Sequence, residues 1–353
     1  MKKISVNAGS GSYEVCIGGG LLKNIGAMLK ETLPKAQKIV VITDETVAPL
    51  YLDTTLKNIA EAGFEADFDV IASGEQSKSG ATYLTLLQTL AEKKITRTDA
   101  LVALGGGVVG DLTGFLAATF LRGIPYVQVP TTLLSMVDSS VGGKTAINLG
   151  TSKNLVGAFY QPRLVLCDTD TLQTLSKEAF ADGMTEIIKC GMIDSLSLLQ
   201  QLQSGDVSQM DDIIAHCVTM KRDVVEEDER DTGKRQLLNF GHTIGHAVEQ
   251  LSHQQISHGQ AVALGMVMET RAAIRMGLCP ENALTQLIKL LEQFDLPTVQ
   301  HYCAEDLYEA ALGDKKRAGG KITVVTPRAF GKCELYTMKI EQMFDWIKQG
   351  VSV

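Results

Sequence analysis

Several features are scarce or missing in this 353-residue chain, and each absence argues against a class of protein. The seven cysteines are scattered from Cys16 to Cys333 and form no C-x-x-C pair, which suits a reduced cytoplasm better than secretion. No continuous apolar run follows the two N-terminal lysines, so we expect no signal peptide. The most apolar stretch, residues 100–121, contains a glycine cluster and Asp111, which argues against a membrane helix.

Basic residues are too few and too dispersed for a protein that binds nucleic acid or a membrane surface. Lys and Arg total 33 against 41 Asp and Glu, the formal net charge is -8, and no Lys- or Arg-rich block occurs. Both partners require a basic face. An acidic protein can still bind a phosphorylated metabolite by gathering a few cations at one site. We therefore expect a cytoplasmic protein with a small-molecule partner.

The length and hydrophobic patterning predict two domains. Residues 38–51, KIVVITDETVAPLY, start as a buried parallel strand, and strands then alternate with helices or loops as far as RLVLCDTDTL. Beyond that point apolar residues recur every three or four positions, as in helices, before a hairpin predicted around Gly331. The fold expected is a Rossmann-like α/β domain at 1–170 and a mainly helical domain at 171–353.

Residues at predicted strand ends indicate a bound nucleotide. Gly105, Gly107 and Gly110 match G-x-G-x-x-G between a strand and a helix, where backbone N–H groups cradle phosphate. No acidic residue follows about twenty positions later, so the ribose contact would fall to Asp44 on an earlier strand. A helix N-cap is an equally good interpretation of Asp44.

Two later loops carry further candidate residues. Glu75 and Lys78 follow the next strand, where the alternatives are a nucleotide contact and a solvated turn. Residues 135–162 are rich in small and polar residues and predict a long glycine-bearing loop that serves a site. This loop carries Asp138, Lys144, Lys153 and Asn154.

Half of the six histidines fall at metal-site spacing in the second half of the chain. His242 and His246 lie four residues apart, which places both imidazoles on one helix face, and His258 starts another apolar segment. Two helix-borne nitrogens and a distant third ligand suit zinc, while buried structural histidines are the alternative. Gly241 and Gly245 allow close approach of backbone or ligand.

Other polar residues of the second half could join this site. Glu186 and Lys189 share a helix face, so the acid could complete a metal site and the amine could meet a substrate. On spacing alone, a surface ion pair is the commoner interpretation. Arg235 and Asn239 precede His242 at helical spacing on a compatible face.

The chain resembles the 3-dehydroquinate synthase family over nearly its whole length. The segments that carry the resemblance are GEQSK, GGGVVGD, RGIPYVQVPTTLLSMVDSSVGGKTAIN, SKNLVGAFYQP, GMTEIIKCG, DERDTGKRQLLNFGHTIGHAVE and ISHGQAVALGM. The resemblance implies an NAD-binding first domain, a metal-binding second domain and a homodimer. It implies a phosphorus-oxygen lyase that converts 3-deoxy-D-arabino-heptulosonate 7-phosphate, a phosphorylated sugar acid, to 3-dehydroquinate and phosphate in the shikimate pathway. NAD would be recycled, and zinc would be the metal, with Co²⁺ as a possible substitute.

The resemblance also implies roles for individual residues. It makes Glu186, His242 and His258 the zinc ligands and turns His246 toward the substrate, whereas spacing alone would ligate His246. The catalytic residues it implies are His246, Lys144, Lys189, Arg235 and Asn239. The substrate contacts it implies are Arg122, Asp138, Lys144, Lys153, Asn154, Lys189, Lys221, Arg235, Asn239, His246 and Lys316, with Lys315 as the alternative to Lys316. The NAD contacts it implies are Asp44, Glu75, Lys78, Gly105, Gly106, Gly107, Val108, Val109, Gly110, Asp111, Thr131, Thr132, Lys144, Lys153, Thr171, Leu172, Gln173 and Thr174. The chain departs from the family pattern at Ser152, where glycine is usual.

Three rival functions share part of this pattern. A polyol dehydrogenase of the glycerol dehydrogenase type would use zinc and NAD but would need fewer cations. A cyclase that makes deoxy-inosose is closer, although Asn239 before GHTIGH fits dehydroquinate synthase better. A catalytically silent metabolite-binding protein would release no phosphate.

Overall fold

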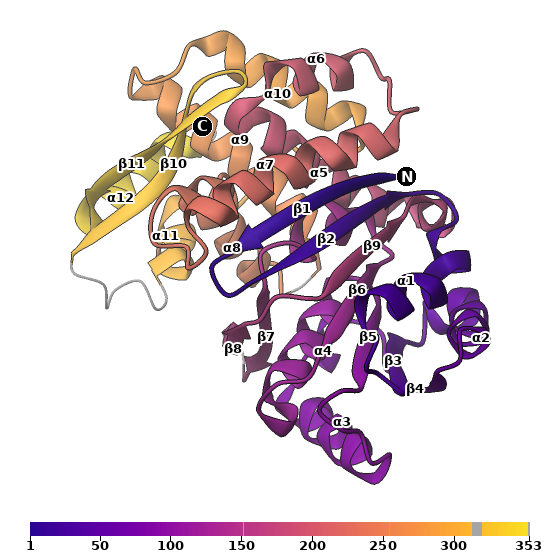
Figure 1. Cartoon of the computed structure of the whole chain (residues 1–353). Helices are drawn as coiled ribbons and strands as arrows, with labels where there is room; N and C mark the ends of the chain where they lie inside the picture. Colours follow the sequence, from indigo (N-terminus) through magenta and orange to yellow (C-terminus); the bar gives the residue numbers. More distant parts are fainter. Residues whose placement is uncertain (151, 254, 313–319, 352–353) are drawn as a thin grey trace. The chain divides into compact units, whose positions relative to one another are not determined.

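The structure is a computed structural model that describes residues 1–150, 152–253, 255–312 and 320–351. The chain divides into two compact units. The colours of Figure 1 follow the sequence from the N-terminus (indigo) to the C-terminus (yellow). The first unit comprises Met1–Ser176 and Met210–Arg230, and the second comprises Lys177–Gln209 and Asp231–Val353. A segment beyond the predicted boundary at residue 170 therefore clusters with the first unit.

A seven-stranded sheet organises the first unit. Its strands are β1 (Lys2–Ala8), β2 (Gly11–Gly18), β3 (Lys38–Asp44), β4 (Glu65–Ile71), β5 (Ala100–Gly105), β6 (Tyr126–Pro130) and β9 (Leu164–Asp168). They lie in the order β1-β2-β9-β6-β5-β3-β4, and every pairing is parallel except that of β1 with β2. The predicted α/β fold with a mainly parallel sheet is confirmed.

Helices cover both faces of this sheet because its central strands are apolar on both faces. Ile39 and Val41 of β3 pack in a core with α1 (Ile25–Thr32) and α2 (Asp53–Glu61). Val40 and Ile42 of the same strand pack in another core with α3 (Gly80–Glu92) and α4 (Gly107–Thr119). A strand buried on both faces reads as a continuous apolar run, as the sequence KIVVIT does.

The first unit also contains a hairpin and a returning helix. The segment predicted as one long loop, residues 135–162, instead forms the antiparallel strands β7 (Lys144–Leu149) and β8 (Ser152–Phe159) over much of its length. Helix α7 (Met210–Glu227) packs against β1 and the short helix Ser135–Ser139. A hydrogen bond joins α7 to the hairpin β1–β2: the Glu226 side chain accepts from the Asn7 backbone N–H (2.6 Å).

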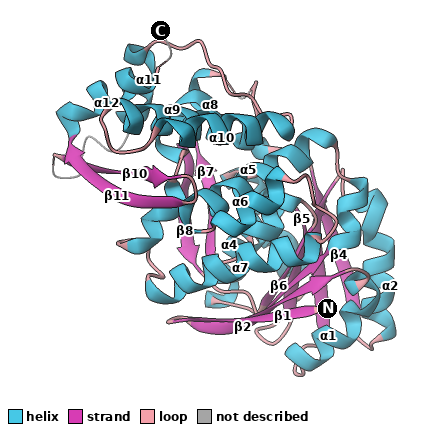
Figure 2. Cartoon of the chain, turned by 90° about the horizontal axis from the view of Figure 1, so that it is seen from above, coloured by secondary structure: helices cyan, strands magenta, loops and turns pink. Residues whose placement is uncertain are grey.

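The second unit is mainly helical, as predicted, and Figure 2 shows its helices in cyan with one small hairpin in magenta. Around Gly331 the strands β10 (Lys321–Ala329) and β11 (Lys332–Lys339) pair antiparallel, which confirms the predicted hairpin. The described part of the chain has no helix that is both long enough and apolar enough to cross a membrane. The helices of this unit are α5 (Lys177–Asp194), α6 (Leu196–Gln203), α8 (His242–Leu251), α9 (His258–Arg275), α10 (Glu281–Gln293), α11 (Ala304–Leu312) and α12 (Met343–Gly350).

Candidate functional site

The carboxyl ends of three neighbouring strands bring predicted nucleotide contacts to one edge of the sheet. Asp44 ends β3, Gly105 ends β5 and Thr131 follows β6, and these strands are adjacent. Helix α4 starts at Gly107 after Gly106, with no side-chain cap, so its first backbone N–H groups can face an anion. This edge is where open α/β sheets bind nucleotides.

The Asp44 carboxylate is engaged in its own loop. Its Oδ1 accepts hydrogen bonds from the backbone N–H groups of Thr46 (2.8 Å) and Val47 (3.0 Å). The Ser73 hydroxyl donates to the same oxygen at 3.1 Å. These bonds stabilise the turn at residues 45–47 and not the helix Ala48–Leu52, whose N-cap is Val47, so Asp44 is not the predicted helix N-cap. A ribose contact stays a prediction.

The other predicted cofactor residues at this edge follow β6 and β9. The hydroxyl oxygens of Thr132 and Ser135 lie 2.8 Å apart. Thr171 to Thr174 belong to the 3-10 helix that follows β9, and the Tyr51 hydroxyl donates to the Thr171 carbonyl at 3.3 Å. Both segments therefore sit just beyond the carboxyl end of a parallel strand.

Lys78 is buried, so a solvated turn is the wrong interpretation for this residue. Its Nζ lies 2.5 Å from Asp111 Oδ2 and also donates to the side-chain oxygen of Asn154. Burial raises the pKa of Asp111, and the neighbouring Lys78 charge opposes that shift. The Lys78 ammonium therefore links Asp111 of helix α4, a predicted NAD contact, to Asn154 of strand β8, a predicted substrate contact.

Predicted substrate residues of the first unit lie in and around the same hairpin. Asp138 forms an ion pair with Lys221 of helix α7, with 2.7 Å between Oδ1 and Nζ. Lys144 opens β7 and Lys153 follows the first residue of β8, and both side chains are exposed. Arg122 is exposed at the end of the 3-10 helix Phe120–Arg122 and has a left-handed backbone, φ 68°.

In the second unit, glycines let three helices approach closely enough to assemble a cluster of histidines. A Cβ on Gly265 of α9 would lie 1.9 Å from the Gly241 carbonyl oxygen at the start of α8, so only glycine permits this packing. A Cβ on Gly259 would lie 2.5 Å from the Asp182 Cα of helix α5. Gly265 thereby allows the start of α8 to pack on α9, and Gly259 allows the N-terminal end of α9 to pack on α5, one turn before Glu186.

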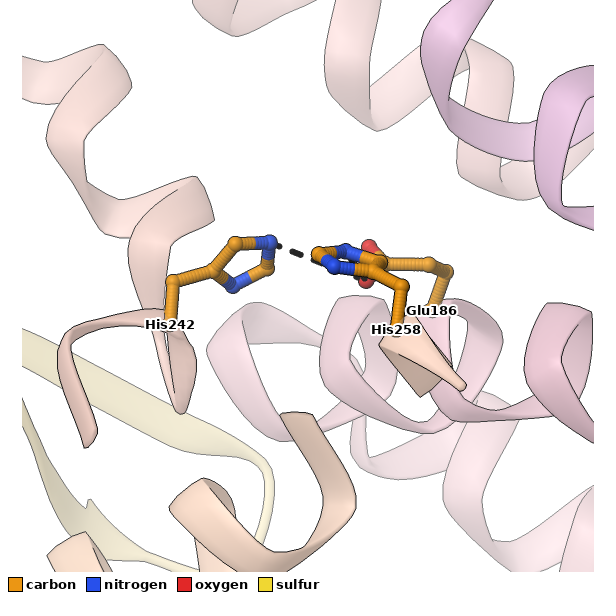
Figure 3. A group of neighbouring side chains, drawn as sticks. All are labelled: Glu186, His242 and His258. Carbon is orange, nitrogen blue, oxygen red and sulfur yellow. Dashed lines mark ion pairs between the residues drawn. The ribbon is translucent and has the colours of Figure 1, made fainter. Parts of the chain in front are cut away.

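Glu186, His242 and His258 converge from these three helices, and Figure 3 shows their side chains pointing toward one another. His242 Nε2 lies 3.9 Å and His258 Nε2 4.0 Å from Glu186 Oε1. Tetrahedral zinc with bonds of about 2.0–2.2 Å separates its ligand atoms by roughly 3.4 Å, so a small contraction would suffice. These residues form one of the two groups of the described chain whose ligand atoms could hold a metal ion.

The Glu186 carboxylate is poorly satisfied by the protein alone. It is 3% exposed, and among the described residues neither of its oxygens has a hydrogen-bond donor in suitable geometry. Lys189, one turn along α5, forms an ion pair with Oε2 and is also buried. The pair is therefore not the surface ion pair that spacing alone favoured, and a cation beside Oε1 would satisfy the acid.

The outer ring nitrogens of both histidines are already bonded. His242 Nδ1 lies 3.1 Å from the Phe240 carbonyl oxygen, and His258 Nδ1 lies 3.4 Å from Glu249 Oε2. A carbonyl or carboxylate at Nδ1 fixes the tautomer that leaves Nε2 free to bind a metal. Both Nε2 atoms are the ones nearest to Glu186.

Burial and neighbouring charges set the ionisation of these rings. Burial lowers the pKa of His242 well below its usual value, and the nearby Lys189, His258 and His246 lower it further. Burial acts in the same direction on His258, but Glu249 and Glu186 outweigh it and raise the pKa of His258. His242 is thus held neutral, as a metal ligand must be. At His258 a proton would compete with a metal ion for the ring.

His246 is exposed and lies beside the cluster. Its ring centroid is 5.3 Å from that of His242 and 5.9 Å from that of His258, so the expected shared helix face is confirmed. His246, Glu249 and His258 make up the other group that could hold a metal. Sequence reasoning missed Glu249, although His242, His246 and Glu249 follow the i, i+4, i+7 spacing of one helix face.

The remaining predicted residues of this unit differ in exposure. Arg235 is buried and Asn239 half-buried in the 3-10 helix Lys234–Asn239, which ends three residues before His242. Lys315 and Lys316 lie outside the described residues, so their roles stay predictions.

Comparison with known proteins covers most of the chain. The family model for the 3-dehydroquinate synthase N-terminal region matches residues 69–182, and that for the C-terminal region matches residues 183–317. A 3-dehydroquinate synthase from Enterococcus faecalis is 44% identical over 348 residues, which is 97% of each chain. The fold matches a 2-deoxy-scyllo-inosose synthase solved with carbaglucose-6-phosphate, NAD⁺ and Co²⁺, with TM-score 0.88, 26% identity and 99% and 100% of the two chains covered. It also matches ValA, a 2-epi-5-epi-valiolone synthase from Streptomyces hygroscopicus with bound NAD⁺ and Zn²⁺, with TM-score 0.84, 26% identity and 99% and 98% covered.

Proposed function

Because the chain belongs to the 3-dehydroquinate synthase family, we propose that it converts 3-deoxy-D-arabino-heptulosonate 7-phosphate to 3-dehydroquinate and phosphate. The observation that carries the proposal is the 44% identity to a 3-dehydroquinate synthase across 97% of both chains. The 2-deoxy-scyllo-inosose synthase and the 2-epi-5-epi-valiolone synthase compared above are each 26% identical. Phosphate would leave by elimination, which breaks the carbon–oxygen bond of the phosphate ester, and a carbocycle would then close, so the enzyme would be a lyase.

The metal in this proposal is zinc, with Co²⁺ as a possible substitute, and its ligands are Glu186, His242 and His258. The buried carboxylate without suitable donors, the two inward Nε2 atoms and the bonded Nδ1 atoms support this ligand set. Three protein ligands leave a position for a substrate hydroxyl. When bound, zinc would lower the pKa of that hydroxyl, and NAD⁺ would accept a hydride and later return it.

The proposed NAD site lies in the first unit, at the carboxyl edge of its sheet. The N-terminus of helix α4, where Gly106 provides no side-chain cap, supports a role in holding the pyrophosphate. The residues proposed to line this site are Asp44, Glu75, Lys78, Gly105, Gly106, Gly107, Val108, Val109, Gly110, Asp111, Thr131, Thr132, Lys144, Lys153, Thr171, Leu172, Gln173 and Thr174.

The proposed substrate residues are mostly cations, as a ligand with a carboxylate and a phosphate requires. The guanidinium of Arg235 offers a bidentate fork for the carboxylate, and His246 is exposed beside the metal cluster, where it can exchange a proton with substrate. Carboxylates such as Asp138 would bind substrate hydroxyls. The full set proposed is Arg122, Asp138, Lys144, Lys153, Asn154, Lys189, Lys221, Arg235, Asn239, His246 and Lys316. We also propose that the enzyme works as a homodimer in the cytoplasm.

Phosphate release with a catalytic amount of NAD⁺ tests this function. The protein should release many phosphates per cofactor molecule without steady accumulation of NADH absorbance, and a chelator should stop the reaction until zinc is restored. Accumulation of NADH in step with product would instead indicate a dehydrogenase. A protein that binds the substrate but releases no phosphate would indicate a silent binding protein.

A further inference from the structure

Asn148, which the sequence did not single out, connects three of the predicted ligand-binding residues of the first unit. Its side-chain Nδ2 donates to Glu75 Oε1 at 2.7 Å, and its Oδ1 accepts from the Asn154 backbone N–H at 2.8 Å. Its own backbone N–H donates to the Lys78 carbonyl at 2.8 Å. The half-buried residue therefore joins the loop that contains Glu75 to the hairpin β7–β8.

The position in the hairpin explains why the backbone of Asn148 is free for this contact. The register of β7 and β8 shifts between Ile147 and Leu149, so Asn148 falls at an irregularity of the ladder. It forms an isolated parallel bridge with Ser79 instead. Irregular strand positions of this kind commonly re-aim a side chain.

Chemistry dictates how the Asn148 amide is oriented. A backbone N–H can only donate, so the atom facing Asn154 must be the carbonyl oxygen Oδ1. An ionised carboxylate can only accept, so the atom facing Glu75 must be the NH₂ group. Aspartate at this position would present a second acceptor to Glu75, and an aliphatic residue would serve neither partner.

The same contacts hold Asn154 in an uncommon conformation. Its backbone has φ 55°, in the left-handed region where asparagine is tolerated better than most residues. The bond to Asn148 fixes its N–H, and Lys78 Nζ donates to its side-chain oxygen. Lys78 in turn pairs with Asp111 of helix α4. The direction of the Asn154 side chain thus depends on both Asn148 and Lys78.

We propose that Asn148 is a positioning residue that holds Glu75 for NAD⁺ and Asn154 for the substrate. The inference rests on the proposed function, because that function assigns ligands to Glu75 and Asn154. Asn148 acts through these neighbours and need not touch either ligand.

Asn148→Asp separates the two contacts. The variant keeps an acceptor for the Asn154 N–H but places a second carboxylate against Glu75, which displaces that side chain. Because a hydrogen bond to a charged group is lost, we expect the Kd for NAD⁺ to rise on the order of tenfold. Zinc content should equal that of the wild-type protein, since the proposed zinc ligands belong to the second unit.

A second substitution tests whether the effect passes through Glu75. Glu75→Gln in the Asn148→Asp background supplies an amide that donates to the new carboxylate, which restores the hydrogen bond with reversed polarity. If the two residues acted independently, the fold-increases in Kd for NAD⁺ of the two single variants would multiply in the double variant. We expect the Kd of the double variant to be lower than that product. Asn58→Asp is the control, because it makes the same chemical change on helix α2, where the amide donates to the Thr54 carbonyl of its own helix.

The measurements are NAD⁺ titration calorimetry on zinc-loaded protein, zinc content, and kcat and KM for phosphate release. Recovery in the double variant, with Asn58→Asp behaving as wild type, supports the positioning role. Wild-type NAD⁺ affinity in Asn148→Asp, or simple multiplication of the two losses, overturns it. If Asn148→Asp does not fold, a double-mutant cycle of Asn148→Ala and Glu75→Ala replaces it. Independent losses of NAD⁺ affinity in that cycle overturn the inference. A wild-type protein that neither binds NAD⁺ nor releases phosphate overturns the proposed function, and this inference with it.

Discussion

Replacing Glu186 with glutamine, alone and together with Lys189→Met, should separate metal binding from folding. The change keeps the size of the side chain but removes the charge that faces both His242 and His258. Zinc sites in small proteins supply roughly 10–16 kcal/mol from four ligands, so one ligand of this kind contributes about 3 kcal/mol. We therefore expect the Kd for zinc to rise on the order of 100-fold.

The same substitution also removes the negative charge of an ion pair with the buried Lys189. Removing one member of a buried ion pair typically costs about 3–5 kcal/mol, so the variant should unfold at a lower temperature even without metal. Adding Lys189→Met removes the second charge and should recover much of that stability. It should recover none of the zinc affinity, because the ligand is still missing.

Competition with a chromophoric chelator gives the zinc affinity, and thermal unfolding of the metal-free proteins gives the stability. Wild-type zinc affinity in Glu186→Gln would refute the ligand assignment. Zinc binding restored by Lys189→Met would show that the first variant failed through misfolding, and would also refute it.

Three further predictions concern the residues around the metal cluster. Glu249→Gln should weaken zinc binding about tenfold, because the carboxylate orients the ring of His258; an unchanged Kd would rule this out. Glu249 and Glu186 raise the pKa of His258 above its usual value, so zinc affinity should fall as the pH is lowered through that raised pKa. A zinc titration at several pH values should show a smaller loss of zinc affinity in Glu249→Gln over the same pH range. His246→Ala should lower kcat for phosphate release while zinc content stays full, and loss of zinc in step with activity would make His246 a ligand instead.

Local spacing predicted much of the second unit but not how it is buried. The spacing of His242 and His246 predicted their shared helix face, and the strands around Gly331 were predicted from their β-branched residues and glycine turn. The i, i+3 spacing of Glu186 and Lys189 identified a pair, yet nothing local distinguishes an exposed pair from one at 3% exposure. Burial depends on which helices pack outside the pair, and that is a property of the tertiary structure.

Contacts between distant segments were beyond sequence reasoning from the residues alone. Glu186 lies beside the histidines because glycines allow close packing of α5, α8 and α9, and only the resemblance to a family had grouped these three residues as metal ligands. The hairpin β7–β8 was predicted as a loop because its small and polar residues have low strand propensity, and its cross-strand pairing overrides that preference. Asn148 gave no signal, since an asparagine in such a segment has the same appearance whether or not its amide bridges two loops.

The return of helix α7 to the first unit bears on how the chain is synthesised. The chain passes from one unit to the other after Ser176, after Gln209 and again after Arg230. The strand β1 is made first, but the helix that packs on it is translated about two hundred residues later, at synthesis rates of roughly 5–20 residues per second. During synthesis, the surface of β1 that α7 covers therefore stays exposed until α7 is translated. Helices α5 and α6 of the second unit are made before the first unit is complete. No single cut in the chain can release either unit whole.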